Sequence, residues 1–410
     1  MKAYERLINY VQIHTTSDPD AETVPSTSRQ FDLAKVLADE MTALGISDVR
    51  VDEKCYVYGT IPATAGCEDA PALGFLAHLD TAPDFSGEHV HPQIHKNYDG
   101  KDLPLGTSGL VLSPSKFPHL ADLAGQTLIT TDGTTLLGAD DKAGIAAIMT
   151  AAEVLLGNQA PHGKICLCFS PDEEIGGGAE DLDIPAFGAA YAYTVDGGAA
   201  NEIEYENFNA AEAVFTIKGF AIHPGDAKDK MINAALLACR INAMLPEAET
   251  PRDTEGYEGF FHLTDMEGDV SGATLSYIVR DHSAENFEAR LATLRHIEKI
   301  MNERWGEGTV TLTITMQYRN MKEKILPCMH LVDNAKAAIR ELGMEPVTSP
   351  VRGGTDGAQL SYRGLPCPNL GTGGYAFHGP YEHITAEAME QVVQVILGII
   401  RKYAEQPDVN

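Results

Sequence analysis

Five short segments place acids and histidines at the ends of predicted strands or in the loops that follow them. Ligand-binding residues of open α/β sheets tend to lie at the carboxyl ends of strands. Imidazole nitrogens and carboxylate oxygens without a thiolate suit a catalytic zinc or cobalt site. The segments are His78-Leu79-Asp80, Gly138-Ala139-Asp140-Asp141, Asp172-Glu173-Glu174, Thr194-Val195-Asp196-Gly197 and Phe377-His378-Gly379.

The first segment follows the apolar run GFLA, which predicts that His78 lies at the end of a strand. Residues two apart on a strand face the same side, so Asp80 can support the His78 ring and fix its tautomer. A strand-end histidine paired with a turn aspartate is an equally ordinary explanation. Taken alone, this spacing is a weak signal for metal binding.

The segment GADDKAGIAA is more specific, because two adjacent acids open an apolar helix. One acid is enough to cap the helix and to complement its dipole. The other acid of the pair Asp140–Asp141 is therefore surplus to capping. A carboxylate has two oxygens, so the surplus acid is suited to bridging two cations.

The segment SPDEEIGGG places three acids between a buried-looking strand and three glycines. Most acidic runs are solvated turns. Here, however, Glu173 and Glu174 diverge from each other, so one can ligate a metal while the other acts on water. The glycines allow the backbone to bend closely around such a site.

Two further segments carry weaker signals. Asp196 ends an apolar strand and precedes two glycines, whereas His378 lies in a glycine-rich loop where a lone histidine is usually a surface residue. The stretch RGGTDG at 352–357 supplies Arg352, which suits an anionic group or a surface salt bridge.

These segments lie on alternating helices and strands. Continuous apolar runs predict strands that are covered on both faces, which indicates an α/β domain. A helix from Phe31 to Leu44 has possible N-caps at Ser26 to Ser28, and Gly45 ends it. The other predicted elements are strands at 57–61, 73–80, 164–170 and 191–198 and a helix at 141–156.

The pattern changes near residue 207. From there, strand 212–219, helix 231–245, strands 258–267 and 272–280, helix 284–304 and strand 309–317 follow in the β-α-β-β-α-β order of a ferredoxin-like domain. After that, helices at 329–342 and 385–404 indicate that the α/β pattern of the first part of the chain resumes. The sequence thus predicts a catalytic domain in two parts, 1–207 and 323–410, with an inserted domain at 208–322.

The composition of the chain disfavours several classes of partner and location. The formal net charge of −29 disfavours nucleic-acid and anionic membrane partners. No stretch is apolar enough to cross a membrane, and the first residues read as a helix rather than a signal peptide. The seven scattered cysteines lack a C-x-x-C pair, which favours a cytoplasmic location over a disulfide framework.

The combination and order of these segments resemble the M20 family of zinc peptidases and deacylases over essentially the whole chain. The resemblance implies a catalytic α/β domain whose mixed sheet is flanked by helices, with an inserted ferredoxin-like lid and dimerisation domain. Several segments point to the branch of tripeptide aminopeptidases, which release the N-terminal residue from tripeptides. These segments are TTDGTTLLGADDKAGIA, FSPDEEIGGG, TVDGG, ENFNAA, GYEGFFHL, RGGTDGAQLS and GLPCPNL.

The resemblance also assigns roles, and it implies two Zn²⁺ ions per subunit, with Co²⁺ or Mn²⁺ as possible substitutes. Glu173 would be the general base, and Asp80 would orient His78. The Asp140–Asp141 peptide bond would be cis. One zinc would be held by His78, Asp140 and Asp196, and Asp140 would bridge to a second zinc held by Glu174 and His378.

In the inserted domain, the resemblance implies that His223 reaches the site of a neighbouring subunit in a homodimer and stabilises the oxyanion. Arg280, Asn320 and Arg352 would bind substrate. Two arginines are a plausible means of recognising the carboxylate end of a short peptide.

Some alternatives stay open at this stage. Another M20 activity, such as N-acyl amino acid deacylase, dipeptidase or carboxypeptidase, would use the same metals and base with a different pocket. A binding protein that has lost catalysis is disfavoured, because Glu173 and every metal position are intact. His89, His91 and His95 have strand-compatible spacing but no evident carboxylate partner for a further metal site.

Overall fold

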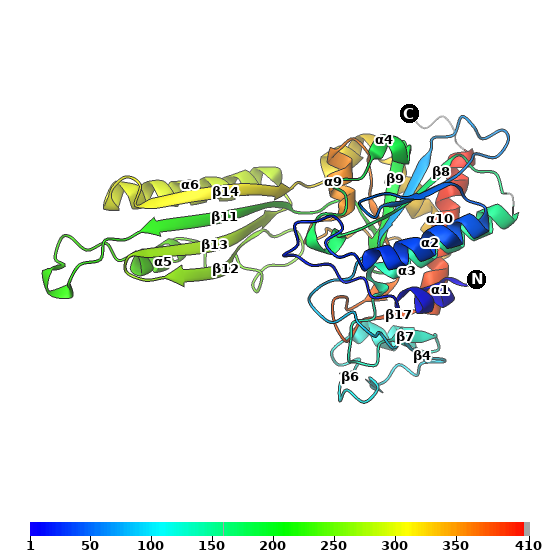
Figure 1. The fold of residues 1–410 in the computed structure, drawn as a ribbon, viewed down its shortest axis with the longest axis horizontal. Coiled ribbons are helices and arrows are strands. Elements are labelled where there is room, and N and C mark those ends of the chain that lie inside the picture. Colours follow the sequence, from blue (N-terminus) through cyan, green and yellow to red (C-terminus); the bar gives the residue numbers. More distant parts are fainter. Residues whose placement is uncertain (159, 406–410) are drawn as a thin grey trace. The chain divides into compact units, whose positions relative to one another are not determined.

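The computed structural model describes residues 1–158 and 160–405, which form two compact units. The first unit contains Met1–Tyr205, Glu323–Ser349 and the described residues from Thr355 onward. The second unit contains Glu206–Lys322 and Pro350–Gly354. Figure 1 shows the elements of both units in sequence colours.

A seven-stranded mixed sheet forms the centre of the first unit, which confirms the predicted α/β class. The pairs β8–β3, β3–β9 and β9–β15 are parallel, whereas the pairs toward both edges are antiparallel. Every residue of β3 and β8 is buried, as their uninterrupted apolar runs predict. In spatial order the strands are β1 (Ser47–Val51), β2 (Val57–Ile61), β8 (Ile165–Ser170), β3 (Leu73–His78), β9 (Tyr191–Gly197), β15 (Asn369–Gly371) and β10 (Ile203–Glu204).

Helices pack against this sheet and against one another. Helix α3 (Ala139–Asn158) contacts β3 and β9 and is buried along most of its length, because it is also covered by α1 and α10. Helix α2 packs on β1 and β2, whereas α4 packs on β8 and α9 on β9. The remaining bounds are α1 (Ala3–Tyr10), α2 (Gln30–Leu44), α4 (Ile184–Phe187), α7 (Lys322–Ile325), α8 (His330–Glu341), α9 (Asp356–Tyr362) and α10 (Ala386–Glu405).

A second, smaller sheet in the first unit is absent from the sequence predictions. Its strands contain only two or three residues each, too few to show a period. The loop between its strands β16 and β17 carries His378. In spatial order the strands are β16 (Gly374–Tyr375), β17 (His383–Thr385), β7 (Leu128–Thr130) and β4 (Gln93–His95); a separate pair is β5 (Leu103–Pro104) with β6 (Val111–Leu112).

The second unit has one antiparallel sheet in the order β12-β13-β11-β14, with helices α5 and α6 in the β-α-β-β-α-β sequence. Alternate residues of its strands, such as Phe215 opposite Leu275, join both helices in one apolar core. The bounds are β11 (Asn209–Lys218), α5 (Ala234–Asn242), β12 (Phe260–Gly268), β13 (Gly272–Asp281), α6 (Ala284–Trp305) and β14 (Val310–Tyr318).

The segment Pro350–Gly354 belongs to the second unit, although the sequence places it in the second part of the catalytic domain. Val351 explains this, because it forms a parallel β-bridge with Asn207. The predicted insertion at 208–322 therefore differs from the observed unit in this returning segment as well as at its start.

The start of α2 also differs from the expectation. Gly45 ends the helix with a φ of 86°, as predicted, but the N-cap is Arg29, which makes no side-chain capping bond. The backbone N–H and the hydroxyl of Ser26 donate instead to the buried carboxylate of Asp172.

Among the described residues, no helix is both long and apolar enough to span a membrane.

Candidate metal centre

The structure brings together the five residues predicted to ligate metal. His78 is 2% exposed at the end of β3, and its Nε2 lies 3.0 Å from Asp140 Oδ1 and 3.4 Å from Asp196 Oδ1. His378 Nε2 lies 3.2 Å from Asp140 Oδ2 and 3.0 Å from Glu174 Oε2. Asp140 therefore faces one histidine with each carboxylate oxygen.

At the start of α3, the side chains of Asp140 and Asp141 have different partners. The Asp140–Asp141 peptide bond is cis, which confirms the prediction, and both residues have non-helical φ and ψ angles. Asp141 caps the helix, since its Oδ1 accepts a hydrogen bond from Gly144 N at 3.1 Å. Asp140 is thus the surplus acid that faces the two histidines.

The donors fit a bound metal. Two groups of three residues each place one potential ligand atom within 4.8 Å of the others, namely His78 with Asp140 and Glu174, and His78 with Asp141 and Asp196. Glu174 Oε1 is buried and has no hydrogen-bond partner among the described residues, which leaves it for a metal. Nitrogen and carboxylate oxygen donors of this kind suit zinc.

Asp141 is a member of the second group that the sequence did not assign to the site. Its Oδ2 accepts a hydrogen bond from His78 N at 3.2 Å, so the carboxylate ties the start of α3 to the end of β3. Gly144 is required beside it, because a Cβ there would collide with the Val195 carbonyl and the Asp141 carboxylate.

Asp80 contacts two parts of the site. Its carbonyl oxygen lies 3.0 Å from His78 Nδ1, and its Oδ1 lies 3.3 Å from the same nitrogen. The carboxylate also accepts the backbone N–H groups of Glu173 at 3.0 Å and Glu174 at 3.2 Å. Asp80 therefore connects the His78 ring to the acidic segment after β8.

Glu173 begins a short 3-10 helix, Glu173–Ile175. Burial, together with the negative charge of Asp356, raises the pKa of Glu173 well above its usual range. Asp356 is itself buried; its Oδ2 accepts a hydrogen bond from Ser170, and its Oδ1 has no partner among the described residues. The carboxyl of Glu173 thus lies in a crowded acidic environment.

Burial and hydrogen bonding have opposite effects on the pKa of Asp140. Burial raises the pKa of Asp140, but hydrogen bonds from His378 and His78 outweigh that effect and lower it. Hydrogen bonds to Asp140 and Glu174 raise the pKa of His378 to about 11. Acids outnumber histidines at this site, a charge balance that a bound cation would improve.

Three more residues that sequence reasoning missed contact the predicted ligands. Asn369 Oδ1 accepts the backbone N–H of Asp196 at 3.0 Å. Glu382 accepts the backbone N–H of Asp140 at 3.0 Å, and Asp84 Oδ2 lies 3.6 Å from His378 Nδ1. The sequence around Glu382, Tyr381-Glu382-His383, is too short to show a period or a motif that would predict this role.

The residues predicted to bind substrate lie in the second unit. His223 is exposed, and its Nδ1 accepts a hydrogen bond from Gly225 N. Asn320 is 9% exposed and accepts the backbone N–H groups of Asn207 and Lys322.

The two arginines of the second unit already contact protein. Arg352 donates four hydrogen bonds, two from each Nη, to Thr254, Gly256 and Glu258. Arg280 donates to the carbonyls of Ala211 and Val279 and to the side chain of Gln317, and it also contacts Tyr318.

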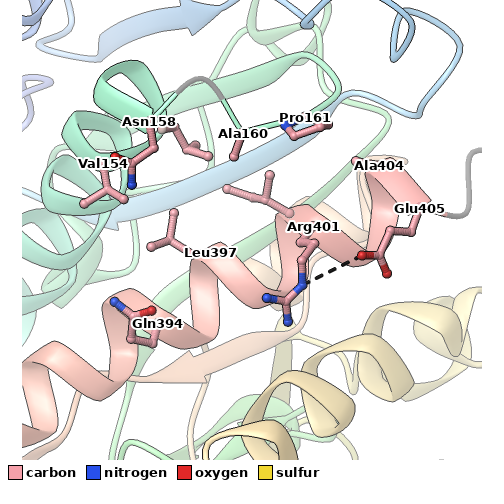
Figure 2. Close-up of a pocket in the computed structure, with 11 residues that line it drawn as sticks. Val154, Asn158, Ala160, Pro161, Gln394, Leu397, Arg401, Ala404 and Glu405 are labelled. Carbon is pink, nitrogen blue, oxygen red and sulfur yellow. Dashed lines mark ion pairs between the residues drawn. The ribbon is translucent and has the colours of Figure 1, made fainter.

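Other features lie apart from the predicted ligands. His95 Nε2 lies 3.1 Å from Thr130 Oγ1, and the trio His89, His91 and His95 forms no potential ligand group within residues 1–158 and 160–405. A pocket of about 450 Å³ lies between α3 and α10. Figure 2 shows Val154 and Leu397 among the residues that line it. None of the predicted site residues lines this pocket.

A mixed sheet flanked by helices, with histidine and acidic side chains that converge beside the ends of its strands, defines a candidate metal-dependent hydrolase. Residues 132–402 match the model of peptidase family M20/M25/M40. The chain belongs to this family and is a metallopeptidase that acts on peptides.

Relatives cover nearly the whole chain. A peptidase T of Desulfitobacterium hafniense is 54% identical over 404 residues, 98% of each chain. The crystal structure of aminopeptidase PepT from Bacillus cereus aligns with a TM-score of 0.78 and 25% identity over 98% of each chain. A tripeptidase from Staphylococcus aureus has the same fold, with a TM-score of 0.78 and 22% identity over 99% of this chain and 98% of its own.

Proposed function

We propose that this chain is a two-zinc aminopeptidase that releases the N-terminal residue from tripeptides. The observation that carries the proposal is Asp140, whose two oxygens face His78 and His378 at 3.0 and 3.2 Å. A bridging carboxylate between two histidine-containing groups is the expected centre of a dinuclear hydrolase. The names of its peptidase T, aminopeptidase and tripeptidase relatives support the substrate class.

The five contacting residues divide into two sets around Asp140. His78, Asp140 and Asp196 would hold one zinc, and Asp140, Glu174 and His378 would hold the other. When bound, a zinc pair lowers the pKa of water and polarises the scissile carbonyl.

Glu173 is the general base in this proposal. Its carboxyl takes the proton of the attacking water and later delivers it to the leaving amine, which balances the hydrolysis without a further acid. Asp80 accepts the backbone N–H groups of both Glu173 and Glu174, so it holds the base beside a metal ligand.

Substrate recognition would come from the second unit. His223 would stabilise the oxyanion, and Asn320 would bind substrate. Arg280 and Arg352 are the two candidates for reading the terminal carboxylate. Arg352 donates to Thr254, Gly256 and Glu258 and so holds one loop, which favours Arg280 as the side chain that reads the carboxylate.

A homodimer through the second unit belongs to the same proposal. The edge strands β12 and β14 each pair with only one neighbour in the described sheet, which leaves edges for another copy. Sedimentation of a fully active monomer at micromolar concentration would contradict this.

All seven cysteines are free, which supports a reducing, cytoplasmic location.

A peptide-length series assayed with zinc, with cobalt and with chelator tests the activity. We expect metal-dependent release of the N-terminal residue from tripeptides and little cleavage of longer peptides. Each tripeptide is paired with its N-acetylated form as a control. Faster cleavage of the acetylated peptides would replace the proposal with an N-acyl amino acid deacylase.

A further inference from the structure

Glu382 is a buried acid that has no role in the proposed chemistry. It is 1% exposed and precedes β17, four positions after His378 in the same loop. Its Oε2 accepts the backbone N–H groups of Leu137 at 2.7 Å and Gly138 at 2.8 Å. Its Oε1 accepts the backbone N–H of Asp140 at 3.0 Å.

These three bonds hold the segment that ends in the bridging acid. Gly138 has a φ of 79°, so the chain turns sharply there and directs neighbouring N–H groups toward one carboxylate. Leu137 and Gly138 precede α3, and Asp140 has non-helical φ and ψ angles. Helical hydrogen bonds therefore do not fix this part of the backbone. Glu382 supplies the missing acceptors.

The same arrangement recurs around the site. Asp80 accepts the backbone N–H groups of Glu173 and Glu174, and Asn369 accepts that of Asp196. Each of these ligand-bearing segments is held by a polar side chain from another segment. Outer residues of this kind tune metal affinity as well as ligand orientation.

We propose that Glu382 is a positioning residue that sets the distance between Asp140 and His378. It lies on the loop that carries His378 and bonds the backbone that carries Asp140, so it links the two ligands whose side chains meet at 3.2 Å. The inference rests on the proposed two-metal site and adds a residue that determines how tightly that site binds.

The test is a cobalt titration of the metal-free chain, followed by visible absorption, for the parent and Glu382→Gln. Glutamine keeps the size of the side chain but has one acceptor oxygen, so it cannot serve both Asp140 N and the Leu137–Gly138 pair. We expect cobalt affinity to fall by about 10–100-fold and the absorption spectrum to change, since outer residues have effects of this size.

Glu40→Gln is the matched control. Glu40 also uses both oxygens, with Arg6 and Tyr10 as donors, but it lies on α2 and contacts none of the predicted ligands. It should lower thermal stability while leaving cobalt affinity and spectrum unchanged. The same result for Glu382→Gln would show a merely structural role and overturn the inference.

Glu382→Asp covers the case in which the glutamine variant does not fold. Aspartate keeps both acceptor oxygens on a shorter side chain, so we expect weaker cobalt binding than in the parent. Parent-like binding in this variant would overturn the inference. A parent chain that binds fewer than two cobalt ions would instead contradict the proposed two-metal site.

Discussion

The two units use their charged side chains in opposite ways. In the first unit, His78, Asp140 and His378 direct their polar atoms toward one another. In the second unit, Arg352 directs four N–H groups to its own neighbours at Thr254, Gly256 and Glu258. Convergence of potential ligands supports a binding role, whereas four hydrogen bonds to one loop support a role in holding that loop.

The largest expected effect comes from Glu173→Gln. Because Glu173 transfers a proton and does not ligate metal in our proposal, kcat should fall by about 10²–10⁴-fold while two metal ions stay bound. Steady-state kinetics together with metal analysis of the purified variant measures both quantities.

Glu174→Gln serves as the comparison for that variant, because Glu174 is a neighbour with a proposed ligand role. It should lose about one metal equivalent along with activity. Loss of metal from Glu173→Gln, or near-normal turnover, would refute the division of roles between the two residues.

Asp140→Asn tests whether one carboxylate serves both metals. An amide has one acceptor oxygen, so both metal sites should weaken together, and metal should no longer stabilise the fold as strongly. At a metal concentration of 100 times Kd, the parent gains about 2.7 kcal/mol, most of which the variant should lose. Thermal unfolding with increasing cobalt measures this; loss from only one of the two sites would argue against a bridge.

The sequence predicts the elements of the fold that have clear periods or caps. The strand Val57–Ile61 is found at its predicted bounds, and α3 contains the predicted helix 141–156. His78 and Asp196 ended predicted strands and Asp140 opened a predicted helix, whereas Glu174 and His378 lay in loops, and the structure brings all five together. Family resemblance was needed to divide them between two metals.

Other features were beyond prediction for physical reasons. The short strands β16 and β17 show no period, because two or three residues cannot establish one. Glu382 accepts N–H groups about 240 positions earlier in the chain, and no local pattern shows which backbone groups need an acceptor. The four hydrogen bonds from Arg352 to residues 254–258 are likewise a product of the tertiary fold.

The arginines allow a sharper comparison within the second unit. We expect Arg280→Met to slow cleavage of a free tripeptide by about 10-fold or more relative to its C-terminally amidated form, since a charge-assisted contact is lost. Arg352→Met should slow both substrates by similar factors, because it mainly holds residues 254–258. Values of kcat/KM for the parent and both variants against the two substrates decide the matter.

A selective loss in Arg352→Met would restore that residue as the reader of the carboxylate. It would also mean that its hydrogen bonds to Thr254, Gly256 and Glu258 exchange for substrate. Equal losses in both arginine variants would argue against carboxylate recognition by either side chain.

The smallest expected effect concerns pH and a half-buried acid outside the ligand set. Glu204 on β10 accepts a hydrogen bond from Asn369 Nδ2 at 2.7 Å, and burial, with the charge of Glu202, raises its pKa to about 7. The folded chain thus keeps this proton at pH values where the unfolded chain releases it. The stability that results is complete below about pH 4.5 and is lost as the pH rises toward 7.

Glu204→Gln stays neutral, so the free energy of unfolding should decline less over this range, by on the order of 1–3 kcal/mol. Urea unfolding of metal-free parent and variant between pH 4.5 and 7.5 measures the difference, and the control is Glu212→Gln at an exposed position of β11 in the second unit. Parallel pH dependences for the parent and Glu204→Gln would show that Glu204 ionises as readily in the folded chain as in the unfolded one.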